Sequence, residues 1–480
     1  MGEQSSDRSL RRHTSAIRHL DAARAREIVA LFTRPVKGDE INLGYDATDP
    51  VAAATHGWLG LEHAAATNPS TAVVGHYRTH LYLHEVLRLP PSVARELARH
   101  HGHLYLDALR SITDTTAAEL AKHPAGGLSL NGLRRLSPAA ARALGRHRGE
   151  LCLNRVRRLD AAAAIGLAAH ANDLYLGGLE QIAPQAAAAL AQHRGNLHLE
   201  KLACPPTRVA KHLARHTGKL HLHGITRLSN AAAEAFGSRT GHLCLQNLRR
   251  LTPQHAKLLA GHRGELQLDS LKLDDVTALF LGQHAGSLCL RVPDDLPLVQ
   301  LASLMHHRGP LELPGLERLD PARARLLAAQ PAPGGHKGLS GLFLPGVSRL
   351  SPTVAAILAR HSAGGLALNG VRLLSEAVAR ELIAHPLLAL DRVESVTDRV
   401  AGILAAHTGT LSLRGLRTLS PAARAKLSEN PGIELPRRVV ETASADANRK
   451  AASATANPGA RRIIQAIERI ARLGDEALRG

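Results

Sequence analysis

The chain has 480 residues, of which 60 are Lys or Arg and 41 are Asp or Glu, so its formal net charge is +19. Only 2% of the residues are aromatic, and a core must therefore be built from leucine and alanine rather than from large rings. The four cysteines form no CxxC pair, which excludes a disulfide-based scaffold and suits a reducing compartment.

The excess of positive charge leaves two interpretations open. It favours an acidic partner, such as nucleic acid, an acidic protein or an anionic membrane surface. Alternatively, the arginines lie on solvated helix faces and reflect a chain rich in Arg and Ala. No apolar run approaches the roughly 20 residues of a membrane span, and the N-terminal MGEQSSDRSLRRH lacks the apolar segment of a secretory signal peptide. We therefore expect a cytoplasmic protein without a transmembrane segment.

We expect residues 1–16 to form a flexible N-terminus and residues 17–436 to form one repeated array. The repeat is clear in LSLNGLRRLSPAAARALGRHRG at 128–149 and again in LCLQNLRRLTPQHAKLLAGHRG at 243–264. The first leucines of successive Leu-x-Leu pairs lie 22 to 24 residues apart, except for one step of 31. A period of this length indicates a solenoid, here of about 18 coils when the weaker INL at 41–43 and WLGL at 58–61 are included.

Each coil is predicted to contain one short strand and one helix. In Leu-x-Leu the leucines recur with period 2, so both face the core and the residue between them faces outward. A Ser, Thr or Asp before a proline, as in Ser137-Pro138, then starts a helix, because its side-chain oxygen accepts a bond from a helix N–H and proline lacks an unpaired donor. Glycines such as Gly149 end the helix. A single coil cannot bury its leucines, whereas stacked coils can.

This pattern resembles the leucine-rich repeat family, and most closely a bacterial variant with LxLxGLxxLSPxxAxxLAxHxG coils. The resemblance implies an α/β solenoid, a horseshoe or arc with parallel strands on its concave face and helices on its convex face. The sequence differs from the family at the position after the strand, where the usual Asn or Cys is replaced by Leu, Val or Ile. We therefore expect no asparagine ladder, so that other groups must satisfy the turn.

Histidine occupies the end of the helix in most coils. Helix C-termini have unpaired carbonyls and a negative dipole end, which favour hydrogen-bond donors, and Arg239, Gln330 and Asn430, which replace histidine in other coils, are donors too. We predict a structural histidine ladder rather than a metal array or a pH sensor. If its rings are buried and neutral, acidification below about pH 6 destabilises the array. The column comprises His56, His76, His100, His123, His147, His170, His193, His216, His262, His284, His307, His361, His385 and His407.

The residue between the two strand leucines changes from coil to coil. Three of the five tyrosines and three of the four cysteines of the chain occupy this one position. A row of tyrosines on a concave sheet favours a protein-binding groove, although Tyr and Cys also suit strands for local reasons. We predict that the partner-binding residues of the concave face are Tyr82, Tyr105, Cys152, Tyr175, His198, His221, Cys244, Gln267 and Phe343.

One part of this face is rich in metal-ligating side chains. His198, His221, His223, His242 and Cys244 are expected on three neighbouring strands. Imidazole and thiolate groups can bind a transition metal, and a thiolate beside a histidine can act as a nucleophile. No sequence motif supports either role, and histidine is common throughout the chain. We therefore favour a polar part of the groove and keep the metal site as an alternative.

The regular pattern is interrupted once and then ends. Residues 328–341 are rich in Pro and Gly, which predicts an irregular break in the array. Residues 437–460 are rich in Ala, Ser and Thr and predict a flexible linker. Residues 461–480 predict a short basic amphipathic helix and tail, which either docks on the last coil or binds a partner helix or an anionic surface.

The sequence contains no P-loop, HExxH, GxSxG or kinase signature, and we predict that the chain is not an enzyme and needs no cofactor. The resemblance implies a protein-interaction scaffold; some bacterial proteins of this kind are delivered into host cells as effectors, which keeps that location open. Nucleic-acid binding is the alternative suggested by charge, but the expected concave face also contains Asp107, Glu200, Asp269 and Glu312. The sequence predicts neither the identity of the protein partner nor the oligomeric state.

Overall fold

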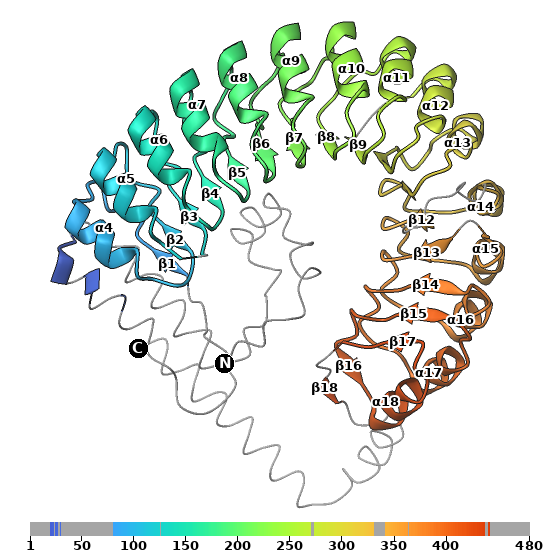
Figure 1. The fold of residues 1–480 in the computed structure, drawn as a ribbon. Coiled ribbons are helices and arrows are strands. Elements are labelled where there is room, and N and C mark those ends of the chain that lie inside the picture. The colour runs from blue at the N-terminus through green and yellow to red at the C-terminus, as the bar shows by residue number, and fades with distance from the viewer. Residues whose placement is uncertain are drawn as a thin grey trace, which may run out of the picture. The chain divides into compact units, whose positions relative to one another are not determined.

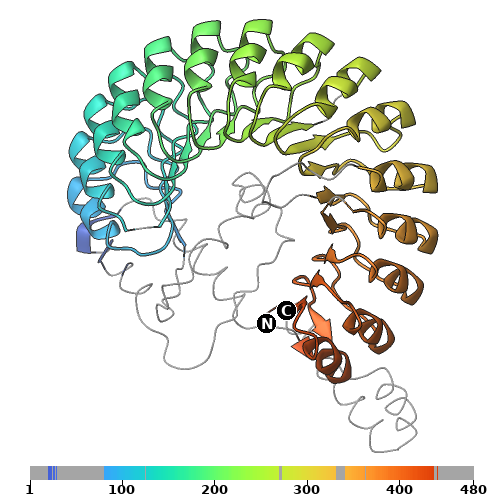
Figure 2. The same ribbon diagram turned by 45° about the vertical axis from the view of Figure 1, so that its right-hand side comes forward.

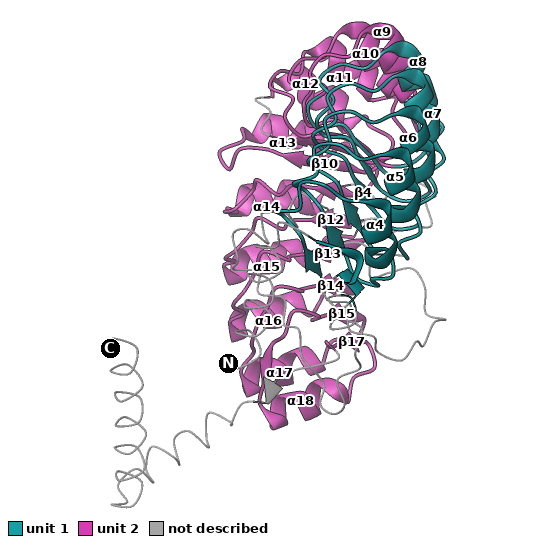
Figure 3. Cartoon of the chain, turned by 90° about the vertical axis from the view of Figure 1, so that its left-hand side faces the viewer, with its two compact units in different colours: residues 1–201, 216–218 teal, residues 202–215, 219–480 magenta. Residues whose placement is uncertain are grey.

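The computed structural model describes residues 80–124, 126–269, 273–330, 341–362, 364–436 and 440–441, together with parts of 20–29. These residues fall into two compact units (Figure 3). Unit 1 comprises residues 1–201 and 216–218, and unit 2 comprises residues 202–215 and 219–480. The expected flexible segment 1–16, the weak coils near 41–43 and 58–61, most of the irregular break, the expected linker apart from residues 440–441, and the C-terminal helix lie outside the described residues.

Unit 1 repeats a two-residue strand and a short helix. Its strands pair in parallel in chain order, with leucine opposite leucine, as Leu81 is opposite Leu104 and Leu151 is opposite Leu174. The strands are β1 (Leu81–Tyr82), β2 (Leu104–Tyr105), β3 (Leu128–Ser129), β4 (Leu151–Cys152), β5 (Leu174–Tyr175) and β6 (Leu197–His198). The helices are α4 (Pro91–Leu97), α5 (Asp114–Leu120), α6 (Pro138–Leu144), α7 (Ala161–Ala168) and α8 (Pro184–Leu190).

Unit 2 continues the same strand and helix unit with the same parallel register. Its main strands are β7 (Leu220–His221), β8 (Leu243–Leu245), β9 (Leu266–Asp269), β10 (Leu288–Arg291), β11 (Leu311–Glu312), β12 (Gly341–Phe343), β13 (Gly365–Ala367), β14 (Leu387–Ala389), β15 (Thr410–Ser412) and β17 (Ile433–Glu434). A separate pair is formed by β16 (Thr418–Leu419) and β18 (Val440–Glu441). The helices are α9 (Thr207–Leu213), α10 (Asn230–Gly237), α11 (Pro253–Leu259), α12 (Asp275–Gly282), α13 (Leu298–Leu304), α14 (Pro321–Ala328), α15 (Pro352–Leu358), α16 (Glu376–Leu382), α17 (Asp398–Ala405) and α18 (Pro421–Ser428).

Within each unit the strands line the inner side of a bend and the helices line its outer side (Figures 1 and 2). The prediction of a strand in each Leu-x-Leu segment and a helix after each turn is therefore confirmed. Both leucines of a segment are buried, as Leu174 and Leu176 are fully covered. Each such leucine contributes about 1.5–3 kcal/mol relative to an exposed position. The core is thus a continuous row of leucines between the strand layer and the helix layer.

The helices begin where the sequence predicts them, at capping residues. Ser137 Oγ accepts a hydrogen bond of 3.0 Å from Ala140 N, and Thr252 Oγ1 accepts one of 3.2 Å from His255 N. Each cap of this kind contributes about 1 kcal/mol. Side-chain caps also start the helices that follow Thr113, Asp160, Ser229, Asp274, Asp320, Ser351, Ser375, Thr397 and Ser420.

A side-chain ladder joins neighbouring coils after the strands, although the position of the family's asparagine is apolar as expected, with Leu133 and Val156 fully buried there. In unit 1, Asn131 Oδ1 accepts a bond of 2.9 Å from Asn154 N, and Asn154 Oδ1 accepts one of 2.9 Å from Gly177 N. In unit 2, Asn369 Oδ1 accepts a bond of 3.0 Å from Asp391 N. These residues directly follow the second strand leucine, so the oxygen reaches the next coil from an earlier position than the apolar one that the sequence analysis considered.

None of the helices in the described part of the chain is long and apolar enough to cross a membrane.

Candidate functional site

The helix-end histidines of the described coils are almost completely buried, with exposed fractions between 0 and 3%. Their rings lie above one another from coil to coil. In unit 1 the ring centroids of His170 and His193 are 5.9 Å apart with planes inclined by 2°, and His193 and His216 repeat these values. In unit 2 the rings of His262 and His284 are 5.6 Å apart. We call this set the histidine column; His56 and His76 lie outside the described residues.

Some rings of the column join their own turn to the preceding coil, as His407 shows. Gly409 N donates to His407 Nδ1 at 3.0 Å, so the ring proton must lie on Nε2. That Nε2 is 2.8 Å from the carbonyl oxygen of His385 in the preceding coil. His262 Nε2 makes the corresponding contact of 2.8 Å with the carbonyl of Gly241. At His407 a neutral imidazole thus acts as acceptor within its own coil and as donor to the preceding coil.

The residues that replace histidine in unit 2 use the same carbonyls. Asn430 Nδ2 donates to His407 O at 2.7 Å, while Asn430 Oδ1 accepts from Gly432 N at 2.9 Å. Gln330 Nε2 donates to His307 O at 3.3 Å. The Asn430 amide therefore reproduces both hydrogen bonds of the imidazole. Arg239, the third replacement, donates instead to His242 O at 3.2 Å within its own coil, so a hydrogen-bond donor is what these residues share.

Burial keeps the column rings neutral. Burial lowers the pKa of His170 to about 4, and the adjacent His193 and His147 lower it further. Burial and the neighbouring rings likewise lower the pKa of His123 to about 3. In unit 2 burial lowers the pKa of His262 to about 4, and burial with the adjacent column rings lowers that of His284 to about 3. A charged imidazole would lose its water without gaining an acidic partner.

The glycine two residues after the histidine allows the coils to approach closely. A Cβ atom added at Gly149 would lie 1.9 Å from the carbonyl oxygen of Gly126 in the preceding coil and 2.9 Å from His147 Nε2. Any other residue would push the two turns apart and disturb the column.

The variable strand position forms an aromatic surface at the start of unit 1. The rings of Tyr82 and Tyr105 are stacked, with centroids 4.6 Å apart and planes inclined by 11°. The rings of His84 and His103 lie 5.5 Å from Tyr82 and 6.3 Å from Tyr105, respectively. Both tyrosines are partly exposed. Burial followed by the adjacent Tyr82 raises the pKa of Tyr105, so its hydroxyl stays neutral and can donate a hydrogen bond. We call Tyr82 and Tyr105 the tyrosine pair.

Three residues expected on the open groove are buried instead. Tyr175 is 2% exposed because its ring stacks on His198 at 4.0 Å. His198 is 4% exposed, and its Nδ1 lies 3.4 Å from Glu200 Oε1. Cys244 is 1% exposed. The sequence predicted that these residues alternate with the core leucines. Side chains of adjacent strands cover them, however, so the prediction that they lie on an open surface is corrected: they are packed. Cys152, His221, Gln267 and Phe343 are partly exposed.

The buried thiols of the strand face remain protonated. Burial raises the pKa of Cys152 well above its ordinary value, and the nearby Glu150 raises it further. Burial and then Glu312 raise the pKa of Cys289 in unit 2. Neutral thiols are poor nucleophiles, so these two cysteines do not favour covalent catalysis.

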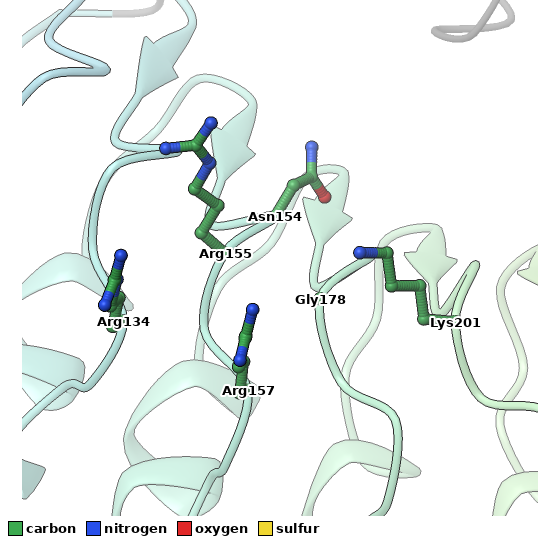
Figure 4. Close-up of a pocket in the computed structure, with 6 residues that line it drawn as sticks. All are labelled: Arg134, Asn154, Arg155, Arg157, Gly178 and Lys201. Atoms are coloured by element: carbon green, nitrogen blue, oxygen red, sulfur yellow. The ribbon is translucent and has the colours of Figure 1, made fainter.

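A basic hollow of about 330 Å³ lies on the turns that follow the strands of unit 1 (Figure 4). No carboxylate among the described residues forms an ion pair with its four cationic side chains. Four positive charges without such a partner attract an anionic group, and guanidinium groups suit carboxylates and phosphates. The sequence analysis did not identify this hollow, although RVRR at 155–158 is a visible signal. It is lined by Arg134, Asn154, Arg155, Arg157, Gly178 and Lys201.

The structure brings three of the five metal-ligand candidates together in unit 2. One ligand atom from each of His221, His223 and Cys244 lies within 4.8 Å of the others. His242 stands beside this group, with its ring 5.5 Å from that of His221. His198 belongs to unit 1 and pairs with Glu200.

No protein-family model matches the sequence, and no curated protein is similar to it. Similar solved structures include a leucine-rich-repeat protein of Leptospira interrogans, at 14% identity and a TM-score of 0.32, which covers 71% of this chain and 97% of that chain. An internalin of Listeria monocytogenes matches at 16% identity and a TM-score of 0.32, covering 69% of this chain and 90% of that chain.

A chain from the Toll–Spatzle complex of Drosophila matches at 15% identity and a TM-score of 0.36, covering 75% of this chain and 45% of that chain. At these values the likeness gives no argument about function. The assignment of the fold follows from the coils themselves, each with a buried Leu-x-Leu strand, a capped helix and parallel pairing to the next coil. The described part of the chain is a leucine-rich-repeat-like solenoid.

Proposed function

We propose that the chain is a non-enzymatic scaffold that binds a protein partner on the strand face of unit 1. The observation that supports this most strongly is the tyrosine pair, two stacked and partly exposed rings on neighbouring strands. Exposed aromatic rings held rigidly by their neighbours give large contact areas at little cost in side-chain entropy, and tyrosine is frequent among the residues that dominate binding energies.

The charges of unit 1 suggest the chemistry of the partner. The basic hollow suits an acidic side chain or a chain carboxylate, because its cations project from the turns into a common space (Figure 4). Glu150 lies just before β4; burial, followed by the nearby Asp173, raises its pKa. A partner segment with apolar or planar groups for the tyrosine pair and acidic groups for the hollow fits both features.

The test compares partner recovery by two variants of the full-length chain. The double variant Tyr82→Ala/Tyr105→Ala is expected to recover the partner at least tenfold less well in a quantitative pull-down, as expected for loss of about 1.4 kcal/mol or more. Tyr175 is left unchanged because it is buried and its loss would disturb the fold.

The matched control is Ile165→Ala on α7, whose side chain is 65% exposed on the helix side of unit 1. It removes an apolar group from the other face, and its recovery should equal that of the wild type. Equal recovery by the double variant and the wild type, with both proteins folded by circular dichroism, would remove the tyrosine pair from the proposal.

Binding of a nucleic acid is the second candidate, favoured by the basic hollow and the net charge of +19. Carboxylates such as Glu150 and Asp173 near the strand face argue against a polyanion lying along the whole face. A salt titration of binding to random-sequence DNA separates the two. Nucleic-acid binding predicts a steep linear fall of log affinity with log salt. The expected cytoplasmic location and the alternative of delivery into a host cell stay predictions.

A further inference from the structure

The first two strands of unit 2 place a group of imidazole and thiol side chains on one face. Leu220 of β7 and Leu222, which follows this strand, are fully buried. His221 and His223 alternate with these leucines and therefore both point to the opposite side. Cys244 of β8 lies directly beside His221 in the parallel register. Two histidines separated by one residue and a cysteine on the adjacent strand therefore converge on one point.

The ligand atoms already have nearly the separation that a metal ion requires. His223 Nε2 is 3.1 Å from Cys244 Sγ, and all three atoms lie within 4.8 Å of one another. Around a tetrahedral ion with ordinary Zn–N and Zn–S bonds, such atoms are about 3.4–3.6 Å apart. Side-chain rotations that move the ligand atoms by about 1 Å are sufficient to reach this geometry, and the strands need not move.

The surroundings hold this arrangement in place. Leu222 N donates to Cys244 O at 2.9 Å and Leu220 N donates to His242 O at 3.0 Å, which fixes the backbone of one strand against the other. The ring of His242 packs 5.5 Å from that of His221, and His242 Nδ1 contacts Glu265 Oε2 at 2.9 Å. In metal sites a carboxylate typically orients a ligating histidine; here Glu265 holds a histidine that stands beside the three ligands.

The other buried cysteine of the same strand position in unit 2 has different neighbours. Cys289 lies between Gln267 and Glu312 in the register, so no histidine is beside it. The histidine and cysteine group is therefore not a consequence of the repeat. It also does not suit a nucleophile, because Cys244 is 1% exposed and a substrate could not reach its sulfur.

We infer that His221, His223 and Cys244 bind a transition-metal ion of the Zn²⁺ class. The two partly exposed histidines face the strand side, so the ion enters from there and the thiol at the base supplies the third ligand. On binding, the S–H bond of Cys244 breaks, its proton passes to solvent and the sulfur lone pair forms the bond to the metal, with no change of oxidation state. The fourth position faces the strand side and takes water or a side chain of a bound partner.

The full-length protein, stripped with a chelator and dialysed, is titrated with Zn²⁺ and separately with Co²⁺. We expect one tightly bound ion per chain and, with Co²⁺, the near-ultraviolet charge-transfer absorption of a cobalt–thiolate bond. Cys244→Ser should abolish that absorption and weaken Zn²⁺ binding at least 100-fold, and His223→Gln should weaken it at least tenfold.

Two controls match these variants within unit 2. Cys289→Ser removes a buried thiol at the same strand position, and His306→Gln removes an exposed histidine outside the group. Both should bind Zn²⁺ like the wild type, which separates the site from adventitious binding by the many other histidines. Thermal melts of the metal-free proteins verify that each variant is folded.

Equal Zn²⁺ affinity of the wild type and a folded Cys244→Ser variant, or a cobalt–thiolate absorption that disappears only in Cys289→Ser, would overturn the inference. Because the titration contains no partner protein, its failure does not affect the proposed scaffold role. Loss of partner recovery in Tyr82→Ala/Tyr105→Ala likewise leaves the metal site untouched.

Discussion

The histidine column and the variable strand position run through the same coils but differ in almost every respect. The column repeats one residue type, is buried throughout and bonds to backbone groups of neighbouring coils. The strand position changes from Tyr to Ser, Cys, His, Gln, Glu, Phe and Ala, and its exposure varies. The requirement at the helix end is the same from coil to coil and histidine meets it in most of them, whereas recognition of one partner requires different groups at different places. We therefore assign stability to the column and binding to the strand position.

Acidification should produce the largest effect, because it acts on all column rings together. An unfolded histidine titrates near pH 6.5, whereas burial lowers the folded pKa of His170, His262 and His385 to about 4 each. Below pH 6.5 the unfolded chain therefore binds more protons, and stability falls by up to about 1.4 kcal/mol per pH unit for each such ring until the folded pKa is reached.

The column's contribution is thus complete above pH 6.5 and is lost as the pH falls towards 4. Thermal melts followed by circular dichroism at pH 8, 6.5 and 5 should show a Tm that falls by roughly 10 °C or more between the first and last values. The carboxyl groups whose pKa is lowered, such as Glu96 beside Arg26, titrate below this window. A Tm that stays constant from pH 8 to pH 5 would contradict neutral burial.

A single ring of the column should have a smaller but clear effect. His193→Ala removes the side chain of a fully buried residue and leaves a cavity, which should lower the unfolding free energy by about 2–4 kcal/mol. His193→Asn should lower the unfolding free energy by about half as much as His193→Ala, because Asn430 makes both hydrogen bonds at the equivalent position. Denaturant unfolding measures both; an Asn variant no more stable than the Ala variant would show that volume, not hydrogen bonding, selects histidine.

The smallest effect is expected at the strand position. Gln267 is partly exposed, and Gln267→Ala should change the unfolding free energy by no more than about 0.5 kcal/mol. The same denaturant experiment tests it beside His193→Ala. If the two substitutions had equal costs, the division between a stabilising column and a binding strand face would be wrong.

The repeated elements were predictable because each depends on a local rule. The alternation of Leu174 and Leu176 specifies a strand with one buried face, and Ser137 before Pro138 specifies a helix start. Most coils repeat both signals, so an error in one coil is corrected by its neighbours. For these reasons the strand and helix of each described coil were located correctly from the sequence.

The contacts between coils were less predictable, because they depend on spacing and curvature rather than on the order of residues. The stacking of Tyr175 on His198 buries both side chains, although each alternates outward in the sequence. The ladder through Asn131 and Asn154 was missed because its oxygen reaches the next coil from an unexpected position. The membership of the group around Cys244, which comprises His221 and His223, likewise followed only from the three-dimensional arrangement.

The protonation of the column is tested most directly by nuclear magnetic resonance of the chain labelled at the histidine rings. His193→Gln assigns one column signal by its disappearance, and the urea-unfolded chain gives the reference titration near pH 6.5. We predict that the assigned signal keeps the chemical shift of a neutral ring, protonated on Nε2, from pH 8 down to the pH at which the fold is lost. A signal that titrates near pH 6.5 in the folded protein would contradict the assignment of this column to stability through neutral hydrogen bonding.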